Sequence, residues 1–145
     1  MDYTNKQSDE LDIFYLEGLN CLDKYLDNNS SEHHLEKALN NFIFSVESNK
    51  NRAEPYAYIS YCMYLIGEYE SSSKYIEIAS IIDDNSFIVK KMNAIIINYY
   101  KKTEINYKKP LTKGLYDKIN TTYNNFMYNY NLKSKVSNNF IIQFS

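Results

Sequence analysis

The side chains with the greatest potential for chemistry are two histidines and two cysteines. His33 and His34 are adjacent, and neighbouring residues on a helix point about 100° apart, so the two rings do not form a metal-binding pair. A zinc site would need both histidines together with Cys21 and Cys62, and their spacing does not match such a site. We therefore expect no metal, no cofactor and two reduced, partly buried thiols.

Carboxylates that lie close together in the sequence also lack the surroundings of a catalytic site. Glu68 with Glu70, and Glu17 with Asp23, have no nucleophile or glycine-rich loop beside them. Asp83-Asp84-Asn85 is similar to a calcium loop only superficially, because the spaced ligands, the glycine and the distal glutamate are missing. No two glycines are near each other, which excludes a P-loop and a dinucleotide fingerprint. We expect no catalytic residues and no enzymatic activity.

Tyrosines at helical spacing are the stronger signal. Between Ala53 and Gly67 the apolar stripe is filled by Tyr56, Ile59, Met63 and Ile66. The other three tyrosines, Tyr58, Tyr61 and Tyr64, must therefore project elsewhere. Exposed tyrosines combine a rigid apolar ring with a hydroxyl, which is typical of protein interfaces. The sequence leaves two occupants open: a partner protein, or the basic C-terminal helix of the same chain.

Composition indicates which fold must position these side chains. The 145 residues, of which 44% are hydrophobic, suffice for one domain with a sizeable core. Only three glycines and two prolines are present, far below the average of about 7% and 5%. Sandwiches, barrels and doubly wound sheets need glycine-rich turns, so the composition predicts an all-α domain.

Apolar residues recur every three or four positions in successive segments, each bounded by cap-forming residues. Asn51 followed by Glu54, and Gly67, are expected to start and end the third of these helices. The pattern predicts about six helices, over residues 11–26, 30–48, 52–66, 69–82, 87–102 and 111–131.

Residues 53–86 resemble a tetratricopeptide repeat, a motif of 34 residues. Its small positions are occupied by Ser60, Ser72 and Ala79, which let the paired helices approach closely, and its turn by Gly67-Glu68-Tyr69. Met63 in place of an aromatic residue and Asp84 in place of proline depart from the motif. The resemblance implies an antiparallel helical array in which each repeat stacks on the next.

The remaining segments extend this interpretation to a single helical-repeat domain over residues 1–145. Residues 8–51 are expected to form a degenerate repeat with a turn lengthened by about eight residues around Asp27–His34, and residues 87–102 half a repeat. Residues 111–131 are expected to form a capping helix, and residues 132–145 a tail with a strand-like end, Phe140–Phe144. In size and architecture the chain is similar to small bacterial secretion chaperones of the tetratricopeptide class.

Proteins of this family bind an extended or helical peptide on the concave face made by the first helix of each repeat. The resemblance implies that a partner-binding groove is lined by Asp12, Tyr15, Leu19, Leu22, Ala57, Tyr58, Tyr61, Tyr64, Lys91, Ile95, Asn98 and Tyr99. On this alignment Ala57 lies on the open groove and tolerates a larger side chain, whereas Ala79 lies where two helices touch and does not.

Charge is unevenly distributed along the chain. Residues 1–87 carry 16 acidic and 6 basic side chains, and residues 88–145 carry 2 acidic and 10 basic ones. This asymmetry fits a basic end that packs on the acidic body, or two faces for two partners. The start has no basic, apolar leader, and the longest apolar run is too short to span a bilayer, so we expect a cytoplasmic protein.

The sequence therefore predicts a non-enzymatic module that binds a segment of a partner protein, as a chaperone or adaptor. One alternative is a structural or adaptor protein that self-associates into a homo-oligomer. Another is a module whose basic tail docks on nucleic acid or an anionic membrane, although nucleic acid is disfavoured because that tail has scattered lysines and no arginine.

Overall fold

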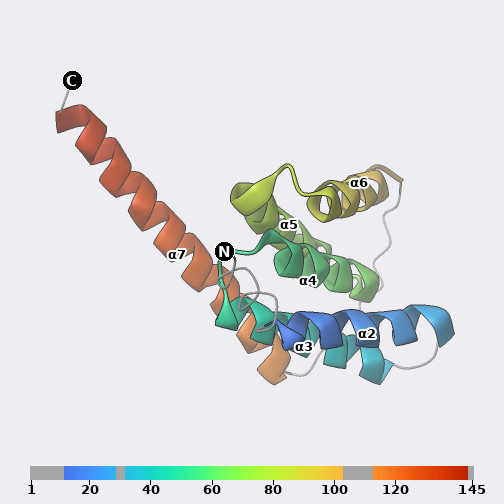
Figure 1. Ribbon diagram of the computed structural model, residues 1–145. Coiled ribbons are helices and arrows are strands. Elements are labelled where there is room, and N and C mark those ends of the chain that lie inside the picture. The colour runs from blue at the N-terminus through green and yellow to red at the C-terminus, as the bar shows by residue number, and fades with distance from the viewer. Residues whose placement is uncertain (1–11, 29–31, 103–112, 144–145) are drawn as a thin grey trace, which may run out of the picture. The chain divides into compact units, whose positions relative to one another are not determined.

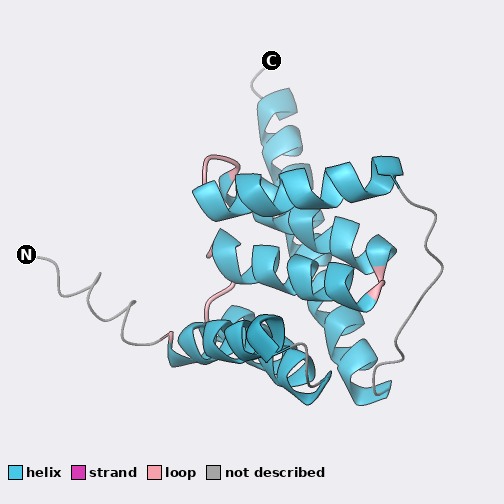
Figure 2. Cartoon of the chain, turned by 90° about the vertical axis from the view of Figure 1, so that its right-hand side faces the viewer, coloured by secondary structure: helices cyan, strands magenta, loops and turns pink. Residues whose placement is uncertain are grey.

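Helices make up the described structure, and the all-α prediction is confirmed. The computed structural model describes residues 12–28, 32–102 and 113–143, and no strand occurs among them (Figures 1 and 2). The helices are α2 (Ile13–Asn28), α3 (Glu32–Ser48), α4 (Ala53–Ile66), α5 (Tyr69–Asp83), α6 (Phe87–Lys102) and α7 (Lys113–Gln143). No helix in these ranges is long and apolar enough to cross a membrane.

The chain divides into two compact units, Met1–Leu111 and Thr112–Ser145. The described part of the second unit is α7, one helix of 31 residues in which the rings of Phe126 and Tyr130 stack 6.3 Å apart. The expectation of a strand-like end was wrong for Phe140–Gln143, which are helical. Continuing the helix satisfies the backbone hydrogen bonds of these residues within the segment itself. Capping by this helix stays a prediction.

In the first unit, the pair α2 and α3, the pair α4 and α5, and then α6 follow one another as layers (Figures 1 and 2). α4 is the central helix because it packs on α3, α5 and α6. Nine of its 14 residues are buried: Ala53, Pro55, Tyr56, Ala57, Ile59, Ser60, Cys62, Met63 and Ile66.

Gly18 sets the distance between α2 and α3. A Cβ atom added there would lie 2.6 to 2.9 Å from three atoms of the Phe42 ring, far inside van der Waals contact. Phe42 is fully buried, so its ring has no room to move away. The residue at position 18 must therefore have no side chain if these two helices are to pack at this distance.

Two serines hold α4 against α5. The Ser60 hydroxyl donates to the Ser72 carbonyl oxygen at 2.6 Å, and the Ser72 hydroxyl donates to the Ser60 carbonyl oxygen at 2.8 Å. Both side chains and Ala79 are fully buried, as expected for positions where paired helices touch. The reciprocal bonds satisfy both hydroxyls, so the close approach leaves neither of them unpaired.

Gly67 ends α4 as predicted. Its backbone is left-handed, with φ 93° and ψ 9°, and its N–H donates to the Tyr64 carbonyl while the Glu68 N–H donates to the Met63 carbonyl. This hydrogen-bond pattern is a Schellman motif, which reverses the chain in two residues. Ser86 caps α6, because its hydroxyl accepts a hydrogen bond from the Val89 N–H at 3.4 Å.

Two local expectations were wrong. The cap of α4 is Arg52 in extended conformation rather than Asn51, whose N–H donates to the Asn49 side chain at 3.0 Å. The segment Asp27–His34 was expected to lengthen a turn, but its two ends lie in α2 and α3, so most of the insertion lengthens these helices. Helix elongation satisfies backbone groups that a longer turn would leave to solvent.

The contact at Gly18 gives a test with an internal control. We expect Gly18→Ala to lower the free energy of unfolding by about 1–3 kcal/mol, because the added methyl group overlaps the Phe42 ring. Gly114, the second residue of α7, has no atom within 4 Å of such a Cβ. Gly114→Ala should therefore leave stability unchanged or raise it by up to about 1 kcal/mol. Urea denaturation of both variants measures the difference, and equal effects would contradict the packing of α2 on α3.

Candidate functional site

A hollow lies between α2, α4 and α6, within the first unit of the chain. Its volume is about 190 Å³. α4 supplies the floor, α2 one wall and α6 the other. The lining residues are Leu19, Leu22, Asp23, Leu26, Tyr58, Tyr61, Lys91, Met92 and Ile95.

The floor rests on a cluster of three aromatic rings, one from each of α2, α3 and α4. The Tyr58 ring stacks on Phe42 at a centroid distance of 5.3 Å, and it meets the edge of Tyr15 at 5.9 Å. Burial raises the pKa of the Tyr58 hydroxyl, and the Asp23 carboxylate adds to this rise. The Tyr58 hydroxyl is therefore neutral at physiological pH and can donate a hydrogen bond.

The second floor tyrosine belongs to another stack. The Tyr61 ring lies 6.0 Å from Tyr64, and Tyr64 lies 6.2 Å from Tyr69 at the start of α5. Burial is also the main cause of the raised pKa of Tyr61. Half-buried rings stacked in this way have few accessible rotamers, so the floor is formed before any ligand binds.

Apolar side chains continue along both walls. On α2, Leu16, Leu19, Asp23 and Leu26 follow one another at intervals of three or four residues and so share a face; Leu16 is 60% exposed and Leu26 45%. On α6, the equivalent face carries Phe87, Lys91 and Ile95, and Phe87 is 75% exposed. The exposed apolar side chains therefore continue from the hollow toward the start of each wall helix, at Leu16 and Phe87.

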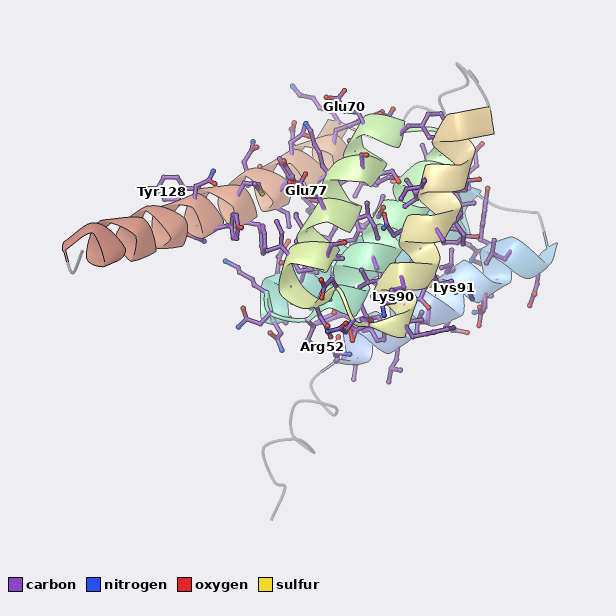
Figure 3. All side chains as sticks on the ribbon, turned by 90° about the horizontal axis from the view of Figure 1, so that it is seen from above. Arg52, Glu70, Glu77, Lys90, Lys91 and Tyr128 are labelled. Carbon is purple, nitrogen blue, oxygen red and sulfur yellow. The ribbon has the colours of Figure 1, made fainter. Side chains whose placement is uncertain are left out.

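The two walls differ in charge. Asp23 and Asp27 are exposed on α2, four residues apart, and Lys91 is exposed on α6 (Figure 3). Between Phe87 and Ile97, α6 contains Lys90 and Lys91 and no acidic residue. A ligand in the hollow therefore meets negative charge on one side and positive charge on the other.

Half of the twelve residues in the expected groove line this hollow: Leu19, Leu22, Tyr58, Tyr61, Lys91 and Ile95. Tyr64 stacks beside them without lining it. The side chains of Asn98 and Tyr99 lie outside the described residues. Three lining residues, Asp23, Leu26 and Met92, were missed, although helical spacing from Leu19 would have found Asp23 and Leu26 on the same wall.

Asp12 and Tyr15 were expected in the groove, but both belong to a structural network. The Asp12 carboxylate caps α2 by accepting from the Tyr15 N–H at 3.1 Å, accepts from the Ser45 hydroxyl at 2.7 Å, and pairs with Arg52. The Arg52 guanidinium lies 5.0 Å from the centre of the Tyr15 ring. These contacts join α2, α3 and the start of α4, so Asp12 is buried and Tyr15 supports Tyr58 from behind.

Ala57 was also expected on the groove surface, and this was wrong. The residue is fully buried, as is Ala79. α4 has neighbours in three directions, so the face opposite its main apolar stripe is also covered at this position. The repeat alignment underestimated how much of the central helix the other helices enclose.

The cysteines offer no nucleophile to the hollow. Both are free and buried. Burial raises the pKa of Cys21, and the hydrogen bond that its thiol donates to Glu17 at 3.6 Å raises it further; burial alone raises the pKa of Cys62. Over the ranges that the structure describes, no three His, Cys, Asp or Glu side chains gather as they would around a metal ion.

Comparisons of the chain with protein-family models, with curated proteins and with solved structures gave no match. The resemblance to a tetratricopeptide repeat, which is strongest over residues 53–86, therefore stays a prediction from the sequence.

The burial of Ala57 reverses the expected tolerance at this position. We expect Ala57→Leu to lower the free energy of unfolding by about 1–3 kcal/mol, because the larger side chain must be accommodated in a closed core. Ala94, which is exposed on α6, is the matched control, and Ala94→Leu should change stability by at most about 0.5 kcal/mol. Thermal melting measures the stability of both variants. An unchanged melting temperature for Ala57→Leu would contradict the burial of Ala57 and support its expected place on the groove surface.

The two thiols give a second test. Their raised pKa keeps them protonated at pH 8, and only the thiolate attacks a disulfide reagent. Asn20 is exposed beside Cys21, so Asn20→Cys supplies an accessible thiol on the same helix. We expect Cys21 and Cys62 to react with 5,5′-dithiobis(2-nitrobenzoate) at least about tenfold more slowly than this added cysteine, and equally fast once the chain is unfolded. Rapid labelling of the native, unsubstituted chain would contradict their burial.

Proposed function

We propose that the chain is a protein-interaction module that binds a segment of a partner protein in the groove between α2, α4 and α6. The observation that carries the proposal is the hollow itself, which combines the aliphatic side chains of Leu19, Leu22, Leu26, Met92 and Ile95 with two tyrosines, Tyr58 and Tyr61, and two charged residues, Asp23 and Lys91. Aromatic side chains supported from behind, within an apolar strip and beside charged residues, are the usual composition of a protein-binding site.

The size of the hollow supports a protein ligand over a small molecule. Pockets for small molecules and cofactors enclose about 300–1,000 Å³, well above the 190 Å³ found here. A cavity of about 150 Å³ accommodates one benzene ring, so this hollow has room for one large apolar side chain. Leu16 and Phe87, which are exposed beside the hollow, then contact the neighbouring residues of the same segment.

Site-specific photocrosslinking tests the proposal with a matched pair of positions. Leu26 and Ile97 are both 45% exposed, and only Leu26 lines the hollow. We expect the photoreactive residue p-benzoylphenylalanine at position 26, in cells that naturally contain the chain, to yield a defined crosslinked protein at least about fivefold more strongly than at position 97. Mass spectrometry of the crosslinked product identifies the partner.

Two results would contradict the proposal. Equal crosslinking from positions 26 and 97 would show that the contact is not specific to the groove. Crosslinking from position 26 only to the same chain would show that a second copy, or another segment of the same copy, occupies the groove instead of a different protein.

A further inference from the structure

The backbone N–H and C=O groups of the groove are not available to hydrogen-bond a ligand. All nine lining residues belong to helices, and apart from Leu26, in the last turn of α2, they lie where N–H and C=O groups bond within the helix. The groove therefore has no strand edge to which an extended peptide could add. The lining side chains that carry polar or charged groups are Tyr58, Tyr61, Asp23 and Lys91.

These lining groups favour a helical peptide over an extended one. From Leu16 to Leu26 the apolar wall of α2 is about 15 Å long, which about five residues of extended chain would cover. Those residues carry about ten backbone N–H and C=O groups, and the groups turned toward the walls would lose water without gaining a partner. A helix of about ten residues covers the same length and satisfies its backbone internally.

We propose that the segment bound in this groove is an amphipathic helix with one large apolar anchor, basic residues on the flank that faces α2 and acidic residues on the flank that faces α6. The anchor fills the hollow above Tyr58 and Tyr61. The flanks follow from charge complementarity with Asp23 and Asp27 on one wall and Lys91 on the other. This inference rests on the proposed function and adds the conformation and charge pattern of the ligand.

Selection from a random peptide library tests the conformation, because any sequence that fits the groove can be enriched. Phage-displayed random 16-residue peptides are panned on the full chain, and enriched sequences are synthesised with a fluorescent label for anisotropy titrations. We expect enriched peptides to repeat apolar residues every three or four positions. A central proline should weaken their binding more than tenfold, because it breaks a helix and leaves an extended chain intact.

Lys91 and Lys90 give the matched pair for the charge pattern. Both are exposed on α6 (Figure 3), and of the two only Lys91 lines the hollow. We expect Lys91→Glu to weaken binding of the enriched peptides at least fivefold and Lys90→Glu to change it less than twofold. Replacing the acidic flank of a peptide by lysines should restore its binding to Lys91→Glu, which a merely destabilised variant would not show.

The remaining outcomes separate this inference from the proposed function. Enriched peptides that depend on Lys91 but alternate in polarity and tolerate the central proline would overturn the helical ligand and leave the groove function standing. Failure to enrich any peptide that is sensitive to Lys91→Glu would count against both. Sedimentation that shows a dimer lost in Lys91→Glu and kept in Lys90→Glu would overturn the inference by placing a second copy in the groove.

Discussion

Close contact between α4 and its three neighbours is the constraint on which the first unit depends. A helix packed by α3, α5 and α6 at once can carry large side chains in only a few directions, so small residues occupy the rest. Ala57, Ser60 and Cys62 are all fully buried at these contacts. At Ser60, where the small residue is polar, the reciprocal hydrogen bonds with Ser72 offset the cost of burying a hydroxyl group. In the neighbouring pair, α2 and α3, Gly18 likewise allows the close approach because it has no side chain.

The same constraint produces the site. Once nine of the 14 residues of α4 are buried, the residues left at least partly accessible are Glu54, Tyr58, Tyr61, Tyr64 and Leu65. Glu54, Tyr58, Tyr61 and Leu65 are separated by four, three and four residues, so they form one stripe along the helix. The walls α2 and α6 stand on either side of this stripe. The tyrosines therefore define a floor because every other direction around α4 is occupied.

The sequence predicted the helices well because each has a strong apolar period and a recognisable boundary, such as Gly67 or Ser86. It identified six lining residues because they share helix faces. It failed where contacts join distant positions: Asp12 bonds to Ser45 and Arg52, which are 33 and 40 residues away. It failed at Ala57 because an alanine fits both a surface and a closed contact, and only the positions of the neighbouring helices decide between them.

The groove floor is connected to the core through the rings that support it. The Phe42 ring lies against Gly18 and stacks on Tyr58. Tyr15 links Tyr58 to the ion pair of Arg52 and Asp12. A tyrosine held in this way loses little conformational entropy when a ligand covers it. The charged side chains on the walls, Asp23 and Lys91, are exposed and keep their rotamer freedom. In the binding mode that we propose, the rigid floor supplies most of the binding energy, and the charged walls determine which charge pattern is accepted.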